Sequence, residues 1–242
     1  MSTNGLLSFS RQEPFGIEAM NLPIATNVTG LPDGPWQTLL THAFHILDDM
    51  QLHSGVANPF WTLGGGTVLM LRYAHRRSKD IDIFIPDPQY LGFLTPRLSD
   101  AAAAVSTDYV EAANFVKLIR KEGEIDFVAS SNLTLHPYEK WDLLGRFVRV
   151  ETATEIVAKK LWHRGDIATA RDLFDLALVI EKEPDQLRTA APFLSKHSGV
   201  FLDQLKQRKT LIQAQFEAID TLTFKPSFEH AFAVASQFLR SL

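Results

Sequence analysis

The strongest constraint in the sequence is the segment from Leu63 to Phe84, in which three consecutive glycines join two patterns of different period. A short β-type run at 60–63 ends at the glycines, and the stretch 67–75 then has the spacing of a helix. The next run, 80–85, reads DIDIFI and alternates strictly, which predicts a strand. A strand, a glycine turn, a helix and a second strand in this order predict a mixed α and β structure for this half of the chain.

The same segment contains a candidate anion site and a candidate cation site. Glycines at 65 and 66 allow positive φ and a close approach of the backbone, and the start of a helix there would present unpaired N–H groups to a phosphate. Residues two apart on a strand share a face, so Asp80 and Asp82 project together while the intervening isoleucines face the core. Paired carboxylates suit Mg²⁺, which also takes water and phosphate oxygens as ligands. Together the two sites indicate phosphoryl or nucleotidyl transfer.

Each of these features alone has a simpler explanation. A glycine turn is ordinarily only a turn, and two acids separated by one residue often lie on an exposed strand edge. The combination is more specific than either part, because the apolar residues that alternate with the acids require one face of the strand to be buried.

The rest of the chain divides into a mixed half and a helical half. Before 60, an arm leads to a helix at 36–50, with Asp33 as its N-cap and Pro35 in its first turn. The sequence predicts a further helix at 88–104 and a hairpin turn at Glu122-Gly123. The other expected strands lie at 115–120, 124–129 and 146–150, and the later helices at 154–162, 169–181, 200–219 and 227–239. We therefore predict an α+β fold in which a small mixed sheet with flanking helices is followed by a helical C-terminal region, with domains 1–151 and 152–242.

Composition excludes several other classes of protein. The chain has no cysteine, which rules out disulfides, thiolate nucleophiles and cysteine-based zinc sites. Its formal net charge of −4 gives no general basic footprint for nucleic acid. No run approaches the roughly 18 apolar residues of a membrane span, and the N-terminus lacks the pattern of a signal peptide. We expect a soluble cytoplasmic protein.

Two separated motifs resemble a known family. The run GGGTVLMLRYAHRRSKDIDIF, residues 64–84, is similar to a signature of the AbiEii/AbiGii toxin-type nucleotidyltransferases, which belong to the DNA polymerase β-like superfamily. The segments EIVAKKL at 155–161 and RDLFDL at 171–176 resemble the second conserved region of the same family. The resemblance covers about residues 60–178 and implies a nucleotidyltransferase core.

The resemblance implies a role for individual residues on the nucleotide side of the site. The positions that match the phosphate-facing turn, the serine two residues before the first acid and the family's lysine are Gly65, Gly66, Thr67, Ser78 and Lys160. Lys159 leaves a one-residue ambiguity in this match. On the predicted helix, Lys160 shares a face with Ile156, whereas Lys159 lies four residues after Glu155, as in an ordinary surface Glu–Lys pair.

It also implies a set of acids. Asp80 and Asp82 match the catalytic pair that binds metal, and Asp126 would be the third acid on a neighbouring strand, either a ligand or a base. Its alternative is a carboxylate at a strand end. Asp172 matches the acid of the family's Arg-Asp pair, and the alternative is that Arg171 and Asp172 are structural and contact neighbouring residues of the helix. The catalytic set so predicted is Asp80, Asp82, Asp126, Lys160 and Asp172.

The expected function is metal-dependent transfer of a nucleoside monophosphate from an NTP to an acceptor hydroxyl, with Mg²⁺ or Mn²⁺ as cofactor. By analogy the family implies a toxin of a toxin–antitoxin or phage-defence system, with tRNA as one candidate acceptor and an antitoxin as a candidate partner. A nucleotide-binding module without turnover and a kinase-like phosphotransferase remain as alternatives. We expect His75, Arg76 and Arg77 only to favour the end of a helix, although arginines and lysines near the site could form a basic rim.

Overall fold

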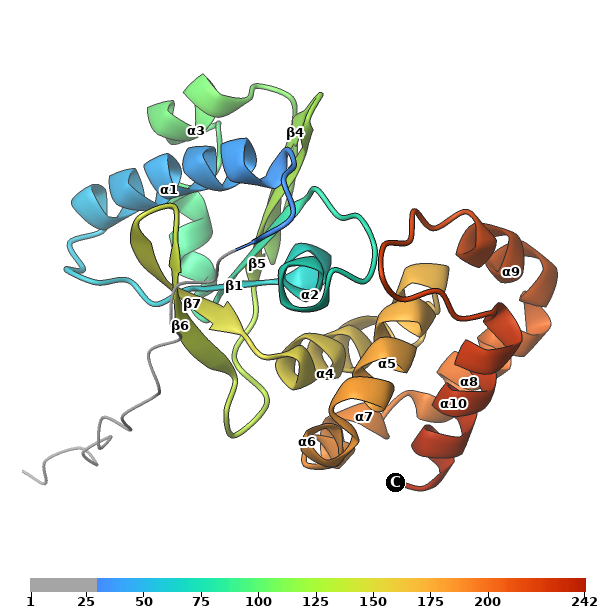
Figure 1. Ribbon diagram of the computed structural model, residues 1–242. Helices are drawn as coiled ribbons and strands as arrows, with labels where there is room; N and C mark the ends of the chain where they lie inside the picture. Colours follow the sequence, from blue (N-terminus) through green and yellow to red (C-terminus); the bar gives the residue numbers. More distant parts are fainter. Residues whose placement is uncertain (1–29) are drawn as a thin grey trace, which may run out of the picture.

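A seven-stranded mixed sheet forms the centre of the computed structural model, which describes residues 30–242 (Figure 1). The spatial order of its strands is β3-β4-β5-β2-β1-β7-β6. β2 is antiparallel to β1 and parallel to β5, and β1 is parallel to β7. The strands are β1 (Thr62–Gly64), β2 (Ile81–Ile85), β3 (Tyr109–Ala112), β4 (Phe115–Arg120), β5 (Gly123–Ala129), β6 (Tyr138–Leu143) and β7 (Arg146–Glu151).

Helices cover both faces of this sheet. α1 packs against β2 and β5 and covers the face that carries the buried isoleucines of β2. α4 lies over the opposite face, where its Lys159 ammonium sits 4.1 Å from the centre of the Phe84 ring. The helices of the first half are α1 (Trp36–His53), α2 (Gly65–Tyr73), the short 3₁₀ helix η1 (Pro88–Phe93) and α3 (Asp100–Val105).

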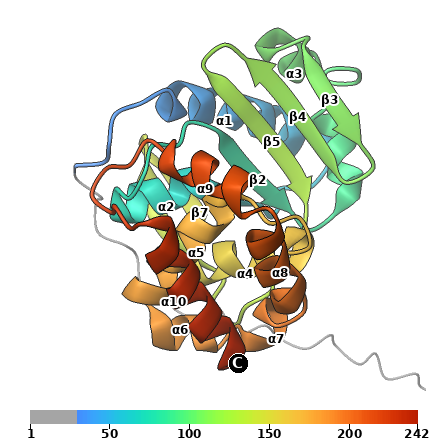
Figure 2. The same ribbon diagram turned by 90° about the vertical axis from the view of Figure 1, so that its right-hand side faces the viewer.

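The second half of the chain packs as helices beside the sheet (Figure 2). Among residues 30–242, the last strand ends at Glu151 and the following elements are helices. They are α4 (Ala153–Arg164), α5 (Ala170–Lys182), α6 (Pro184–Arg188), α7 (Ala191–Leu194), α8 (Ser198–Gln207), α9 (Lys209–Glu217) and α10 (Phe228–Arg240). The prediction of an α+β fold with a mixed sheet followed by helices is confirmed.

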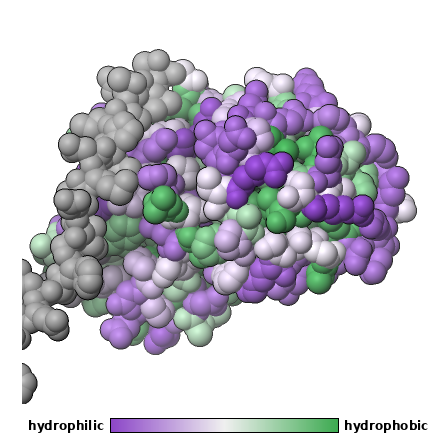
Figure 3. All heavy atoms as spheres, turned by 90° about the horizontal axis from the view of Figure 1, so that it is seen from below, coloured by the Kyte–Doolittle hydropathy of each residue, from purple (hydrophilic) through white to green (hydrophobic). Residues whose placement is uncertain are grey.

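No helix between residues 30 and 242 is both long and apolar enough to cross a bilayer. The face shown in Figure 3 mixes hydrophilic with apolar side chains.

Several predicted boundaries were wrong for local reasons. The expected helix at 88–104 is interrupted around Pro96, and α3 begins only where the Ser99 side chain accepts a hydrogen bond from the Ala102 N–H. The expected helix at 200–219 breaks at Arg208. α1 starts directly after Pro35 without a side-chain cap, so Asp33 is not its N-cap.

The hairpin between β4 and β5 is present, with its turn one residue earlier than predicted. Gly123 already pairs with Arg120, which leaves Lys121 and Glu122 as the turn. The edge strands β3 and β6 were not predicted. β3 is largely exposed, so its sequence has no apolar alternation to reveal it.

One buried carboxylate connects the loop after α2 to the helical half. Asp175 of α5 has no exposed surface, and it accepts two hydrogen bonds from the Arg76 guanidinium, from Nε at 2.7 Å and from Nη2 at 2.8 Å. His75 Nε2 lies 2.9 Å from the same carboxylate. The expectation that His75 and Arg76 only favour a helix end was wrong, because α2 ends at Tyr73 and both side chains turn inward to Asp175.

Burial alone would raise the pKa of Asp175, but the Arg76 guanidinium and the Lys160 ammonium hold that pKa well below its ordinary value. Replacing Asp175 with Asn removes the charge that these buried cations require. We expect Asp175→Asn to lower the free energy of unfolding by about 3–5 kcal/mol, as measured by denaturant titration. The exposed Asp185 provides the matched control, and Asp185→Asn is expected to change stability by less than about 0.5 kcal/mol. Equal effects of the two variants would show that the Asp175 cluster is not a stabilising connection.

Candidate active site

The predicted acids lie on adjacent strands at the centre of the sheet. Asp82 is paired in register with Asp126 of the parallel strand β5 and with Gly64 of β1. Residues opposite each other in a ladder share a face, so the Asp82 and Asp126 side chains lie side by side. Asp80 precedes Asp82 by two residues, and its Oδ1 accepts a hydrogen bond from the Glu124 N–H at 3.0 Å. The structure therefore brings all three predicted acids to one region.

The glycine turn places the start of α2 directly against Asp82. Gly65 has φ +73°, and a Cβ at this position would overlap the Asp82 carboxylate. A Cβ on Gly66 would lie 2.6 Å from Arg76 Nη2 and 3.1 Å from Ser78 Oγ. No side chain caps the N-terminus of α2. Only glycines fit this turn, and the first amides of α2 are left without a side-chain partner beside the acids.

Thr67 has a structural role that the sequence did not predict. Its side chain is fully buried, and its hydroxyl donates to the Asp80 backbone carbonyl at 2.6 Å. Thr67 Oγ1 also lies 3.1 Å from Ser78 Oγ. The Thr67 hydroxyl therefore fixes the start of β2, whereas Ser78 lies over Gly66 at the start of α2.

Asp82 and Asp126 are poorly neutralised by the protein. Burial raises the pKa of Asp82 to about 6, against the opposing charges of Lys160 and Arg164. Burial and the charge of Asp82 likewise raise the pKa of Asp126 to about 6, although Lys117 acts in the opposite direction. Asp126 Oδ1 is buried without a hydrogen-bond partner, and Oδ2 lies 3.2 Å from Lys117 Nζ. Within residues 30–242, the Asp82 carboxylate accepts no hydrogen bond and forms no ion pair.

Lys160 lies on the side of α4 that faces the acids. Its ammonium donates to Asp175 Oδ2 at 2.6 Å and to Asp172 Oδ1 at 3.0 Å. Arg164, one turn later, donates to the same oxygen of Asp172 at 2.6 Å. Asp172 also forms a reciprocal cap with Thr169 at the start of α5, in which Thr169 Oγ1 accepts from the Asp172 N–H and donates to Oδ2. These contacts make Asp172 a residue that positions Lys160 and Arg164.

Lys159 is buried, contrary to the surface pair expected for it. Its ammonium lies 2.6 Å from Glu151 Oε1 and 3.5 Å from Glu155 Oε1, and only 3% of its side chain is exposed. The Thr62 hydroxyl donates to the same oxygen of Glu151 at 2.8 Å. The predicted basic rim must exclude Lys159 and Arg76, because both cations are enclosed by acids.

Sequence reasoning missed Arg76, Asp175 and Glu151 as components of this region. A signal for Asp175 was present, because it is an acid on the apolar face of the segment RDLFDLALVI and requires a buried partner. No local signal pointed to Arg76 or Glu151, since their partners lie far away in the sequence.

The donor atoms fit a hard cation that arrives together with a phosphate. No three histidine, aspartate or glutamate side chains between residues 30 and 242 converge as a metal site of their own. Asp82 and Asp126 nevertheless offer carboxylate oxygens without full hydrogen bonding. Mg²⁺ is commonly bound by one or two carboxylates, with water and substrate phosphates as the other ligands. Asp82 and Asp126, with Asp80 beside them, are the residues that could hold it.

The raised pKa of Asp82 predicts a stability cost that depends on pH. When a carboxyl has a higher pKa in the folded than in the unfolded state, the protein loses stability as pH rises from the unfolded pKa, about 4, to the folded pKa, here about 6. We expect Asp82→Asn to raise the free energy of unfolding at pH 8 by about 1–2 kcal/mol in metal-free buffer, and to give almost no gain at about pH 3.5, below the ordinary aspartate pKa. Denaturant titrations at the two pH values measure this, with the exposed Asp166→Asn as control. A gain that is independent of pH would contradict the assignment.

Comparison with known proteins adds to this geometry. The family model for the nucleotidyl transferase AbiEii toxin of type IV toxin–antitoxin systems matches residues 46–237. No curated protein sequence matches the chain. A putative nucleotidyltransferase from Helicobacter pylori has 17% identity and a TM-score of 0.47, and the match covers 84% of this chain and 94% of the other. The nucleotidyltransferase toxin MenT4 of Mycobacterium tuberculosis H37Rv has 17% identity and a TM-score of 0.48, with coverage of 85% and 84%. The family match spans most of the chain, including both sequence motifs, and shows that this protein belongs to the AbiEii family of nucleotidyltransferase toxins.

Proposed function

We propose that this nucleotidyltransferase moves a nucleoside monophosphate from an NTP to an acceptor hydroxyl, with Mg²⁺ or Mn²⁺ held by Asp80 and Asp82 and with Asp126 as the base or as a third ligand. The observation that carries the proposal is the in-register pair Asp82 and Asp126, incompletely neutralised and adjacent to the uncapped start of α2. Unpaired amides at a helix start bind phosphate, and adjacent carboxylates bind the cation that accompanies it.

In this arrangement the triphosphate lies over Gly65 and Gly66, where Ser78 and Arg76 approach the start of α2. The acceptor oxygen forms a bond to the α-phosphorus, and the bond to the pyrophosphate leaving group breaks. A bound divalent cation would supply positive charge against the phosphate oxygens as negative charge develops. Lys160 supports the triphosphate from α4, held in place by Asp172 and Asp175.

Asp126 is the candidate base for the acceptor hydroxyl. Its pKa of about 6 leaves it mostly ionised at neutral pH but able to accept a proton. Lys117, on the neighbouring strand β4, pairs with both Asp126 and Glu124 and so holds the Asp126 carboxylate in place. Alternatively, Asp126 is the third ligand of the cation and does not act as the base.

The acceptor and the partner follow from the family by analogy. A tRNA is the candidate acceptor, which would place the activity in the cytoplasm, and an antitoxin protein is the candidate partner. The exposed guanidinium of Arg164, on the α4 side of the acids, is available to a nucleic-acid phosphate.

The reaction class is tested by the fate of labelled phosphate. We expect total RNA or protein incubated with the enzyme and each of four NTPs to acquire label from the α-phosphate and none from the γ-phosphate. Asp82→Asn should lower the rate by at least a thousandfold while the protein stays folded, because it removes a charged oxygen that the transition state requires. Transfer of γ-label would establish the kinase-like alternative, and binding of NTP without transfer would establish a non-catalytic module.

The two adjacent lysines are expected to respond differently to substitution by Met. Lys160→Met should lower kcat/KM for the NTP at least tenfold, a loss of about 1.4 kcal/mol of transition-state stabilisation. Lys159→Met should mainly lower the free energy of unfolding, by about 3–5 kcal/mol, because it leaves Glu151 buried without a cation. Kinetics at a temperature where both variants are folded, together with denaturant titration, separate the two effects. An unchanged kcat/KM for Lys160→Met would exclude that lysine from the site.

A further inference from the structure

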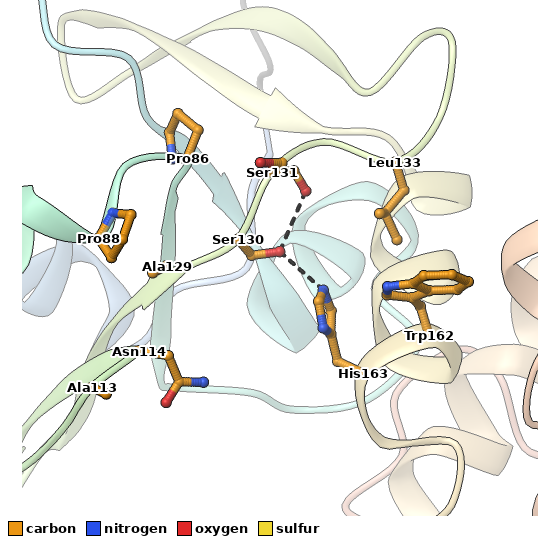
Figure 4. A pocket seen from close by; sticks show the side chains of 10 residues that line it. All are labelled: Pro86, Pro88, Ala113, Asn114, Ala129, Ser130, Ser131, Leu133, Trp162 and His163. Atoms are coloured by element: carbon orange, nitrogen blue, oxygen red, sulfur yellow. Dashed lines mark hydrogen bonds between the residues drawn. The ribbon is translucent and has the colours of Figure 1, made fainter.

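A cavity of about 460 Å³ lies near the carboxyl ends of β2 and β5, beyond the acids (Figure 4). Its volume falls within the range of roughly 300–1,000 Å³ that small-molecule sites occupy. The residues that define its chemistry are Pro86, Asn114, Ser130, Leu133, Trp162 and His163. The phosphate position at the start of α2 and the cation position at the acids do not use this cavity.

The cavity continues the face of the sheet that carries the acids. Side chains alternate along β5, so Ser130 follows Asp126 by four residues on the same face, roughly 13 Å further along the strand direction. α4 lies beside both ends of this interval, because the Lys160 charge acts on Asp82 and His163 Nε2 lies 3.1 Å from Ser130 Oγ. The start of α2 lies at the opposite end, near Asp80 and Asp82. A ligand with its phosphates over α2 would therefore extend along this face toward the cavity.

The wall of the cavity suits an uncharged aromatic ring. None of its lining residues carries a carboxylate, an ammonium or a guanidinium group. Trp162 and the prolines supply flat apolar surface, and the Trp162 ring is held in place by Phe193 at a centroid distance of 5.5 Å and by the Lys196 ammonium at 3.9 Å. Phosphate groups would find no cation on this wall, whereas a nucleobase would find surfaces for stacking.

The same wall offers hydrogen-bonding groups of both kinds. Ser130 Oγ lies 3.3 Å from the Ser131 carbonyl oxygen, which can only accept, and 3.1 Å from His163 Nε2. The serine proton is therefore directed to the carbonyl, and His163 Nε2 is the donor to Ser130. Burial and the charges of Lys159 and Lys196 lower the pKa of His163, which keeps the ring neutral at pH 7. His163 Nδ1 is then an acceptor, and the Asn114 amide supplies both a donor and an acceptor at the opposite wall.

We infer that this cavity receives the nucleobase of the incoming NTP, with the Trp162 side of the wall for stacking and Asn114 and His163 for its polar edge. The inference rests on the proposed function, since it takes the triphosphate to lie at the start of α2. In this assignment, the residues that determine which of the four NTPs is bound lie outside the family motifs, on the β3–β4 turn and the last turn of α4.

A bulky side chain at the mouth of the cavity tests this assignment. Ala113 lines the cavity and is exposed in the turn between β3 and β4, so Ala113→Trp can fill the cavity without entering the core. Its neighbour Ala112 is also exposed but does not line the cavity, which makes Ala112→Trp the matched control. The probes are ATP, GTP, CTP, UTP, inorganic tripolyphosphate and a single-stranded RNA hexamer, and the binding of each is measured by calorimetry in the presence of Mg²⁺.

We expect Ala113→Trp to weaken binding of the preferred NTP at least tenfold and to leave the tripolyphosphate Kd within twofold, while Ala112→Trp changes neither. An unchanged NTP Kd in Ala113→Trp, or equal losses for NTP and tripolyphosphate, would overturn the assignment but leave the proposed function standing. A loss confined to a single-stranded RNA hexamer would place the acceptor's base in the cavity and contradict the assignment to the NTP. A wild-type protein that binds no NTP would contradict the proposed function itself.

Discussion

The buried carboxylate of Asp175 can exist in the core only because Arg76, His75 and Lys160 converge on it from two other segments of the chain. An isolated buried charge costs several kcal/mol, so these contacts are a requirement of the fold. They bring Arg76 to the start of α2 and hold Lys160 on the side of α4 that faces the acids. Backbone bonds from 220–223 to the loop after α2 reinforce the same connection. The positions of the cations around the site therefore depend on α5.

The acids near the centre of the molecule fall into two groups. Glu151, Asp172 and Asp175 each have a buried or half-buried cation within hydrogen-bond distance, and they serve the packing of α4 and α5. Burial raises the pKa of Glu151, Asp82 and Asp126 alike, but within residues 30–242 Asp82 has no ion pair and Asp126 has only Lys117, which Glu124 shares. The structural acids are paired with cations, whereas two adjacent carboxylates keep unsatisfied charge. These carboxylates lower the stability of the protein, and a bound cation and phosphate would restore that stability.

The sequence predicted those parts of the fold that depend on local pattern. Strict alternation identified β2 and correctly placed the isoleucines in the core, and the glycine run marked the start of α2. The edge strand β3 is exposed and has no such pattern, and the break in the helix at 200–219 occurs at Arg208, an ordinary helix-forming residue. Local propensity contains no information on these features.

Predictions for the site failed where a partner lies far away in the sequence. Periodicity placed Lys160 and Lys159 on different faces of the helix, but it treated Lys159 as exposed because the sequence does not show that α4 is enclosed on the side of Glu151. The helix-end explanation of Arg76 was overridden by an ion pair with a residue 99 positions later. The pairing of Asp82 with Asp126 could not be predicted either, because it depends on the register of two parallel strands that are far apart in the sequence. Resemblance to the family suggested the third acid, and the sheet topology places it beside Asp82.

Anomalous diffraction from crystals grown with Mn²⁺ and a non-hydrolysable NTP analogue tests the central claim most directly. We predict an anomalous peak within about 2.0–2.3 Å of carboxylate oxygens of Asp82 and of Asp80 or Asp126, with the triphosphate over Gly65 and Gly66. A peak on other ligands, or a triphosphate bound away from the start of α2, would contradict it.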